Sequence, residues 1–112
     1  MKLPNGERAV VDIVKLRDYC LSEEHPRGKH KARVFKSALG MTADDAETLR
    51  TKLLEAVRTG QATSGEADKY GQRYVLDFTL EWKGKTATVR SAWIVRTDED
   101  FPRLTSCYVL KE

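Results

Sequence analysis

The chain has 112 residues, of which 40% are hydrophobic and 33% are charged. This length suits a single domain over residues 1–112 with one hydrophobic core, and the composition favours a folded soluble protein over a disordered chain. No apolar run approaches the roughly 18 residues of a membrane-spanning helix, and the first residues form no apolar signal region. We therefore expect a cytoplasmic protein without a membrane partner.

The net charge of +3 is too small to indicate nucleic-acid binding, but the charge is unevenly distributed. Basic residues outnumber acidic ones in residues 1–40 and 69–112, whereas acidic residues dominate residues 41–68. This pattern is compatible with a basic face and an acidic back. A uniformly solvated surface is the commoner explanation of such a pattern.

The two cysteines, Cys20 and Cys107, lie far apart in the sequence and form no CxxC pair. Two buried thiols in a reducing cytoplasm are the expected state, with a disulfide or redox role as the alternative. The two histidines are clustered, and this set of residues matches no common zinc-ligand spacing. We therefore expect neither a metal site nor a cofactor.

Three helices are predicted in the first half of the chain. Asp12 is a suitable N-cap for a helix over residues 13–21. A second helix begins near Lys29 and ends at Gly40, because apolar residues recur between them at a helical spacing. Its apolar stripe consists of Ala32, Phe35, Ala38 and Leu39. Thr42 starts a third helix, with aspartates in its first turn.

The second half of the chain reads as strands. Residues 61–68 are rich in Thr, Ser, Gly and Ala and are predicted to be a mobile connection. Residues 74–82 then alternate between apolar and polar, which is typical of a half-buried strand, and residues 103–110 form the last strand. The prediction is an α+β fold with two to three N-terminal helices on one face of a C-terminal antiparallel β-meander of three to four strands.

Lys83-Gly84 suits a two-residue hairpin turn into a strand that runs to about Arg96. This turn places Asp77 opposite Arg90, whereas a slip of one residue would move Arg90 into the core. We expect the helices to cover the apolar face of the meander. The polar face that carries Asp77 and Arg90 should remain open.

The stretch from His25 to Phe35 holds both histidines and several cations, and Pro26 and Gly28 indicate a bend before the second helix. Metal-free RNA cleavage needs an acid, a base and cations that stabilise the charge developing on the phosphorus. His25, or alternatively His30, can serve as the acid or base, and a hydroxyl can bind a phosphate oxygen. The candidate catalytic residues are His25, Lys31, Arg90, Arg103 and Thr105, and the candidate substrate-binding residues are Lys29, Arg33, Ser91 and Asp77.

Each candidate also has a structural interpretation. His25 precedes a proline and can simply cap the turn, and Asp77 and Arg90 can form a cross-strand salt bridge. Arg103 can neutralise the acidic loop at residues 98–100. The cations of the second helix can form a solvated helix face. The tryptophans and Tyr108 are expected in the core or at its rim.

Four sequence blocks resemble a small, uncharacterised bacterial domain family, and the match extends from about Leu3 to Leu110. The blocks are His25-Pro26-x-Gly28-x-x-Lys31-Ala32-Arg33-x-Phe35, Tyr70-Gly71-Gln72-Arg73-Tyr74, Val89-Arg90-Ser91-Ala92-Trp93-Ile94 and Pro102-Arg103-Leu104-Thr105. The order of helices and sheet is more distantly similar to the barnase–EndoU–colicin–RelE superfamily of metal-independent ribonuclease toxins. This second resemblance implies a helix-borne catalytic pair at His25 and Lys31, phosphate-binding cations at Arg90 and Arg103, and a last-strand hydroxyl at Thr105.

The resemblance implies a ribonuclease-like toxin of a toxin–antitoxin pair, with RNA and a small protein from a neighbouring gene as partners. Its site would form where the His25–Lys31 segment folds over the open face of the sheet. One departure is the ending Ser106-Cys107-Tyr108, where a shorter Thr-Ala-Tyr-Pro ending is typical, so the register of the last strand stays open. The alternatives are a non-catalytic nucleic-acid- or protein-binding domain and a domain that recruits a partner strand at its sheet edge.

Overall fold

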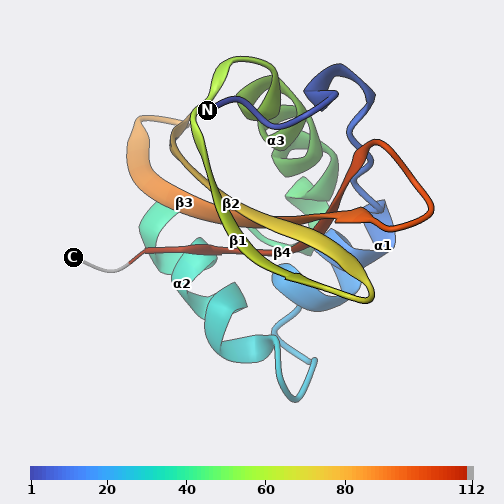
Figure 1. Ribbon diagram of the computed structural model, residues 1–112. Coiled ribbons are helices and arrows are strands. Elements are labelled where there is room, and N and C mark those ends of the chain that lie inside the picture. The colour runs from blue at the N-terminus through green and yellow to red at the C-terminus, as the bar shows by residue number, and fades with distance from the viewer. Residues whose placement is uncertain (111–112) are drawn as a thin grey trace.

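Helices precede strands along the chain, as the α+β prediction requires. The computed structural model describes residues 1–110 (Figure 1). The helical elements are η1 (Gly6–Arg8), α1 (Ile13–Lys15), η2 (Leu16–Cys20), α2 (Lys29–Leu39), η3 (Ala43–Asp45) and α3 (Ala46–Thr59). The strands are β1 (Ala62–Asp68), β2 (Gly71–Trp82), β3 (Lys85–Arg96) and β4 (Pro102–Val109).

The helix starts follow the predicted capping chemistry. The Asp12 side chain accepts a hydrogen bond from the backbone N–H of Val14 at 3.0 Å, and the predicted helix over residues 13–21 forms as α1 followed by one π-helical turn, η2. The Thr42 N–H donates to the Asp45 carboxylate at 3.0 Å in a capping box that opens η3 and then α3. Both caps satisfy N–H groups that have no partner within the helix.

The four strands form an antiparallel meander in the order β1-β2-β3-β4. The predicted Lys83-Gly84 hairpin is confirmed, and both residues adopt the positive φ angles, 48° and 80°, that a tight hairpin turn requires. The predicted register is also confirmed, since Asp77 pairs with Arg90. On the other side of β3, Ala92 pairs with Ser106 but Trp93 pairs with Leu104, so one residue of β4 bulges out of the ladder.

The prediction of a mobile connection at residues 61–68 is wrong, because this segment contains β1. The strand pairs with β2 through its backbone, with an irregularity between Ser64 and Ala67. Only Ala62 is buried, and the rest of β1 is exposed. Its side chains therefore carry no apolar alternation, and backbone hydrogen bonding alone gives no sequence signal.

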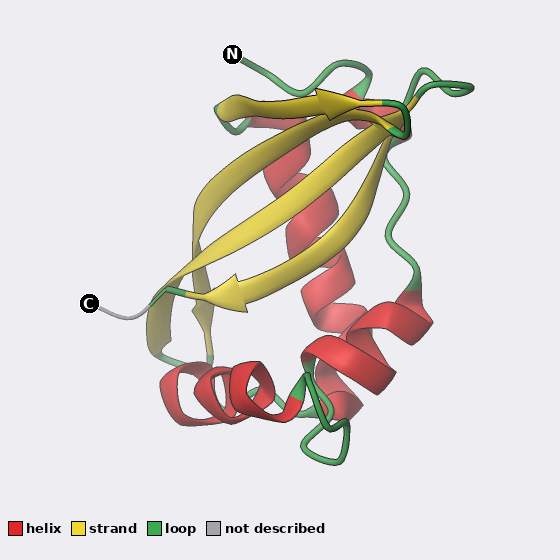
Figure 2. Ribbon diagram, turned by 60° about the horizontal axis from the view of Figure 1, so that its bottom comes forward, coloured by secondary structure: helices red, strands yellow, loops and turns green. Residues whose placement is uncertain are grey.

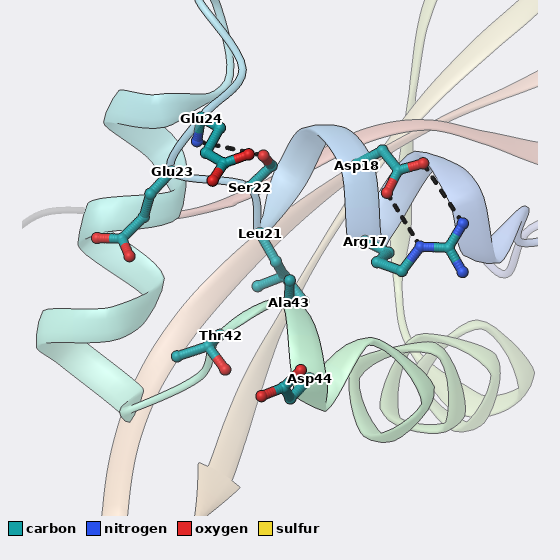
Figure 3. A pocket seen from close by; sticks show the side chains of 9 residues that line it. All are labelled: Arg17, Asp18, Leu21, Ser22, Glu23, Glu24, Thr42, Ala43 and Asp44. Carbon is teal, nitrogen blue, oxygen red and sulfur yellow. Dashed lines mark hydrogen bonds and ion pairs between the residues drawn. The ribbon is translucent and has the colours of Figure 1, made fainter.

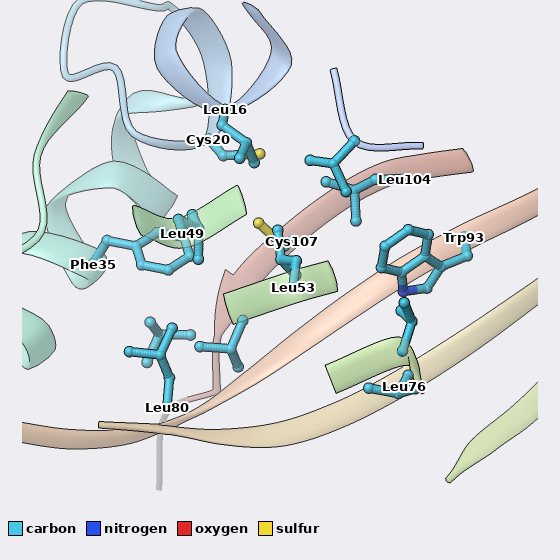
Figure 4. Packing of buried hydrophobic residues seen from close by; sticks show 14 of the residues in the cluster. Leu16, Cys20, Phe35, Leu49, Leu53, Leu76, Leu80, Trp93, Leu104 and Cys107 are labelled. Atoms are coloured by element: carbon cyan, nitrogen blue, oxygen red, sulfur yellow. The ribbon is translucent and has the colours of Figure 1, made fainter. Parts of the chain in front are cut away.

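The helices lie on one side of the sheet, and the other face is left uncovered (Figure 2). Helix α3 runs behind the sheet, while η2 and α2 lie along the β4 edge (Figure 1). The core fills the space between them with large buried side chains, including Phe35, Leu53, Leu76 and Trp93 (Figure 4). Within residues 1–110, no helix has the length and apolar character needed to cross a membrane.

Ser91, a candidate phosphate-binding residue, lies in this core with 0% of its surface exposed. Its hydroxyl donates to the Leu76 carbonyl at 2.6 Å and accepts from the Trp93 indole N–H at 2.8 Å. The hydroxyl therefore satisfies a buried polar group and does not face a ligand on the surface.

Candidate functional site

His25 organises the turn that leads into α2. Its Nδ1 atom accepts hydrogen bonds from the backbone N–H groups of Arg27 and Gly28, each at 3.0 Å. Because Nδ1 is an acceptor, the neutral ring carries its hydrogen on Nε2. Gly28 is required here, since a Cβ atom would collide with the backbone carbonyl of Tyr19 in η2. The turn-capping role considered from the sequence is therefore present, and it leaves Nε2–H as a donor.

The His25 ring packs edge-on against Tyr19, with ring centroids 4.7 Å apart and an interplanar angle of 79°. Both side chains line a hollow of about 420 Å³ that Thr105 of β4 also lines. The Thr105 hydroxyl donates to the Ala92 carbonyl at 3.1 Å and keeps its oxygen lone pairs for another donor. Two of the predicted catalytic residues, His25 and Thr105, are thus brought together.

Lys31, in the first turns of α2, reaches across the β4 edge. Its ammonium lies 3.3 Å from the Ser106 hydroxyl, 4.9 Å from the centroid of the Tyr108 ring and 5.7 Å from that of Tyr19. Within residues 1–110, no carboxylate forms an ion pair with it. Aromatic faces and a hydroxyl stabilise a cation without neutralising it, so this ammonium can still bind an anion.

Arg90 occupies the open face of the sheet, where its guanidinium binds the Asp77 carboxylate through two hydrogen bonds of 2.8 and 2.9 Å. Asp77 and then the neighbouring Tyr108 raise the pKa of Arg90 above its ordinary value. Tyr108 pairs with Arg90 across the β3–β4 ladder, and its ring also lies beneath Lys31. One tyrosine therefore links the ammonium to the guanidinium.

We call this surface the β4-edge site. It comprises Tyr19, His25, Lys31, Thr105, Ser106 and Tyr108, and Arg90 borders it on the open face. The structure does not place His25 and Arg90 in one pocket, since they line separate hollows. They are connected instead by a row of contacts through Tyr19, Lys31 and Tyr108.

Arg103, another candidate phosphate-binding cation, is committed to an ion pair. Its guanidinium binds Glu99 through hydrogen bonds of 2.7 and 2.8 Å and lies over the Phe101 ring at 5.0 Å. It lines a smaller hollow that shares Thr105 with the β4-edge site. The neutralisation of the acidic loop that the sequence suggested is present at Glu99.

The remaining candidates lie around this surface. Lys29 is partly exposed and Arg33 is exposed on α2, outside the row of contacts, and Asp77 is the partner of Arg90. Sequence reasoning missed Tyr19 and Ser106, and it assigned Tyr108 to the core or its rim. Ser106 and Tyr108 flank the buried Cys107, so strand alternation could have placed both on one face once the register was known.

A further hollow lies between η2, the following turn and η3 (Figure 3). Its lining is acidic, with Glu23, Glu24 and Asp44, and its one arginine, Arg17, is paired with Asp18 at 3.0 Å. Carboxylates repel a phosphate, so this hollow does not suit a nucleic acid.

The fold has a solved counterpart. A chain of a contact-dependent growth inhibition toxin–immunity protein complex from Klebsiella pneumoniae 342 superimposes with a TM-score of 0.72 at 16% sequence identity. The alignment covers 96% of this chain and 97% of that chain. At this identity the likeness shows a shared fold alone, and it spans the whole architecture.

Curated proteins offer no relative, since none matches this chain. A family model does match, over residues 2–111, and these residues include all four sequence blocks and the whole β4-edge site. The chain therefore belongs to the family described as Domain of unknown function (DUF6883).

Proposed function

We propose that this protein is a metal-independent ribonuclease that acts as the toxin component of a bacterial toxin–antitoxin pair, with its site at the β4 edge. The observation that carries the proposal is the Lys31 ammonium, which is held by two tyrosine rings and a serine hydroxyl and has no carboxylate partner among residues 1–110. The donor Nε2–H of His25 lies in the same row of contacts. Such a site suits a phosphate group.

The reaction class is cleavage of a phosphodiester by the neighbouring 2′-hydroxyl. Lys31 would stabilise the negative charge that develops on the phosphorus oxygens, and the Thr105 and Ser106 hydroxyls would orient them. His25 would donate a hydrogen bond from Nε2. In the tautomer that the turn holds, Nε2 already carries the ring hydrogen and has no lone pair to accept a proton. We therefore assign His25 a donor role.

The group that exchanges a proton with the substrate would then be the Tyr108 hydroxyl. The Tyr108 ring lies 4.9 Å from the Lys31 ammonium, and Tyr108 pairs with Arg90 across the β3–β4 ladder. A positioned tyrosine hydroxyl can serve as a general acid or base.

The alternative is a non-catalytic nucleic-acid- or protein-binding domain that uses the same surface. It is favoured by one observation, which is that Arg90 and Arg103 are already bound to carboxylates. These pairs leave fewer cations free to stabilise a transition state than the sequence suggested.

The two functions separate in one experiment. Purified protein is incubated with end-labelled RNA in excess EDTA, and cleavage and binding are followed in parallel. Cleavage that is lost in Lys31→Met supports the ribonuclease. Salt-dependent binding without turnover supports the binding domain instead, because phosphate contacts weaken as salt rises.

The small partner protein is the second part of the proposal. The solved complex of similar fold contains a toxin together with an immunity protein, which is the kind of assembly we expect here. Co-expression with the product of an adjacent gene should yield a complex that no longer cleaves RNA. Free protein with unchanged activity would remove the partner from the proposal and leave the nuclease part standing.

A further inference from the structure

The two cysteines meet in the core behind the β4-edge site. Cys20 is the last residue of η2, and Cys107 lies in β4, which packs against η2. Figure 4 shows both sulfur atoms in the space between these elements. Both residues have 0% of their surface exposed, and each thiol is the main influence on the pKa of the other. Residues 87 positions apart in the sequence thus lie in the same part of the core, between η2 and β4.

The surroundings of this pair are not those of two inert core thiols. The residue before Cys107 is Ser106, whose hydroxyl binds Lys31, and the charge of Lys31 acts on both sulfurs. Contact with Cys107, together with Lys31 and Ser106, lowers the pKa of Cys20 to about 7, and Cys20 together with burial raises the pKa of Cys107. The neighbouring thiol and the charge of Lys31 therefore favour the thiolate form at Cys20, which is the form that reacts with an oxidant.

We propose that Cys20 and Cys107 form a reversible dithiol–disulfide pair that a peroxide oxidises. The Cys20 thiolate attacks one oxygen of the peroxide, an S–O bond forms and the O–O bond breaks, giving a sulfenic acid and hydroxide. The Cys107 thiol then attacks the Cys20 sulfur, an S–S bond forms and the S–O bond breaks. In total, two thiols lose two electrons and two protons, and hydrogen peroxide becomes two molecules of water.

Burial determines how the pair reacts. Because neither sulfur is exposed, an oxidant reaches them only when η2 moves away from β4, so oxidation is slower than that of a surface thiol. Once formed, the bridge joins η2 to β4 and closes most of the chain into one loop. Closing a long loop restricts the unfolded chain, so the oxidised protein should unfold at a higher temperature than the reduced one.

The test is mass spectrometry of the intact folded protein after treatment with hydrogen peroxide. We expect the wild-type chain to lose the mass of two hydrogen atoms, a digest to contain a peptide pair linked through Cys20 and Cys107, and a dithiol reductant to reverse both changes. The thermal midpoint should rise on oxidation and fall back on reduction. Cys20→Ser and Cys107→Ser should show neither the mass loss nor the rise.

The wild-type chain oxidised in denaturant is the control. It shows how much disulfide forms between Cys20 and Cys107 when the protein is unfolded. Free thiols in the folded protein, or oxygen added to Cys20 without a bridge, would overturn the proposal. The wild-type readouts decide the matter by themselves if a serine variant does not fold. None of them depends on RNA cleavage, so the outcome is separate from that of the proposed function.

Discussion

Two groups of cations on this molecule differ in what holds them. Arg90 and Arg103 each bind a carboxylate through two hydrogen bonds, to Asp77 and Glu99 respectively. Lys31 is held by two aromatic rings and a hydroxyl. A carboxylate occupies the donor groups that a phosphate would need, whereas aromatic faces leave them free. Nothing in the sequence distinguishes these cations. Their partners show that Arg90 and Arg103 have a structural role, whereas Lys31 is available to bind a phosphate.

The largest expected effect tests the available cation. Lys31→Met should lower RNA cleavage by about 10²–10³-fold, the usual cost of removing one group that stabilises transition-state charge. The matched control is Lys36→Met on the same helix, because Lys36 is exposed and pairs with Glu23 at 3.6 Å. Initial cleavage rates in EDTA measure both. An equal loss of cleavage rate in the two variants would contradict the special role of Lys31.

The next effect concerns the donor beside Lys31. In His25→Asn, the amide oxygen can still accept from the turn N–H groups, but Nε2–H is gone, whereas His25→Ala loses both functions. Both variants should cleave about ten- to a hundredfold more slowly, which corresponds to a charge-assisted hydrogen bond of about 1.5–3 kcal/mol. Only His25→Ala should also lower the thermal midpoint. Full activity in His25→Asn would reduce His25 to a turn cap.

A smaller effect should convert a structural cation into an available one. Asp77→Asn removes the carboxylate that binds Arg90 while keeping the side-chain shape. The freed guanidinium should bind single-stranded RNA a few-fold more tightly and steepen the dependence of log affinity on log salt by about 0.7. Affinities measured across a salt series give both values. An unchanged slope would place Arg90 outside the RNA footprint.

The smallest effect lies in the β3–β4 loop. Arg103 lowers the pKa of Glu99 below its ordinary value, so the ion pair adds stability above that ordinary pKa and loses it as the pH falls through the lowered one. Glu99→Gln should therefore unfold at a slightly lower temperature than wild type near neutral pH. The two midpoints should converge under acid conditions, since a protonated glutamate makes no ion pair. A gap that stays constant with pH would show that the charge of Glu99 is unimportant.

Local chemistry explains how far the sequence could predict this structure. The Lys83-Gly84 turn fixes the β2–β3 register, and with it the Asp77–Arg90 pair, because a two-residue hairpin allows no slip. Strand β1 escaped prediction since it is held by backbone bonds and exposes all but its first side chain, Ala62. Because its sequence lacks apolar alternation, β1 cannot be told from a loop by pattern.

The candidate site was only partly predictable for a related reason. His25 and Lys31 were recognisable by residue type and by their place before and within a helix. Their meeting with Tyr108 was not, because it depends on which face of β4 that residue occupies. The bulge next to Ala92 changes which side chains of β4 face each side of the sheet. No local pattern in the sequence indicates where such a bulge occurs.

That irregularity also has a chemical consequence. In a regular strand, consecutive side chains point to opposite sides, so neighbouring hydroxyls could never serve one ligand. Here Thr105 is the surplus residue without a partner in β3, its hydroxyl donates to the Ala92 carbonyl, and Ser106 lies opposite Ala92. Two adjacent alcohols can therefore be presented together at the rim of the sheet, while Leu104 and Cys107 on either side remain inside. A shortened strand lacking Thr105 should still fold, yet it would offer a phosphate one hydroxyl where the natural strand offers two.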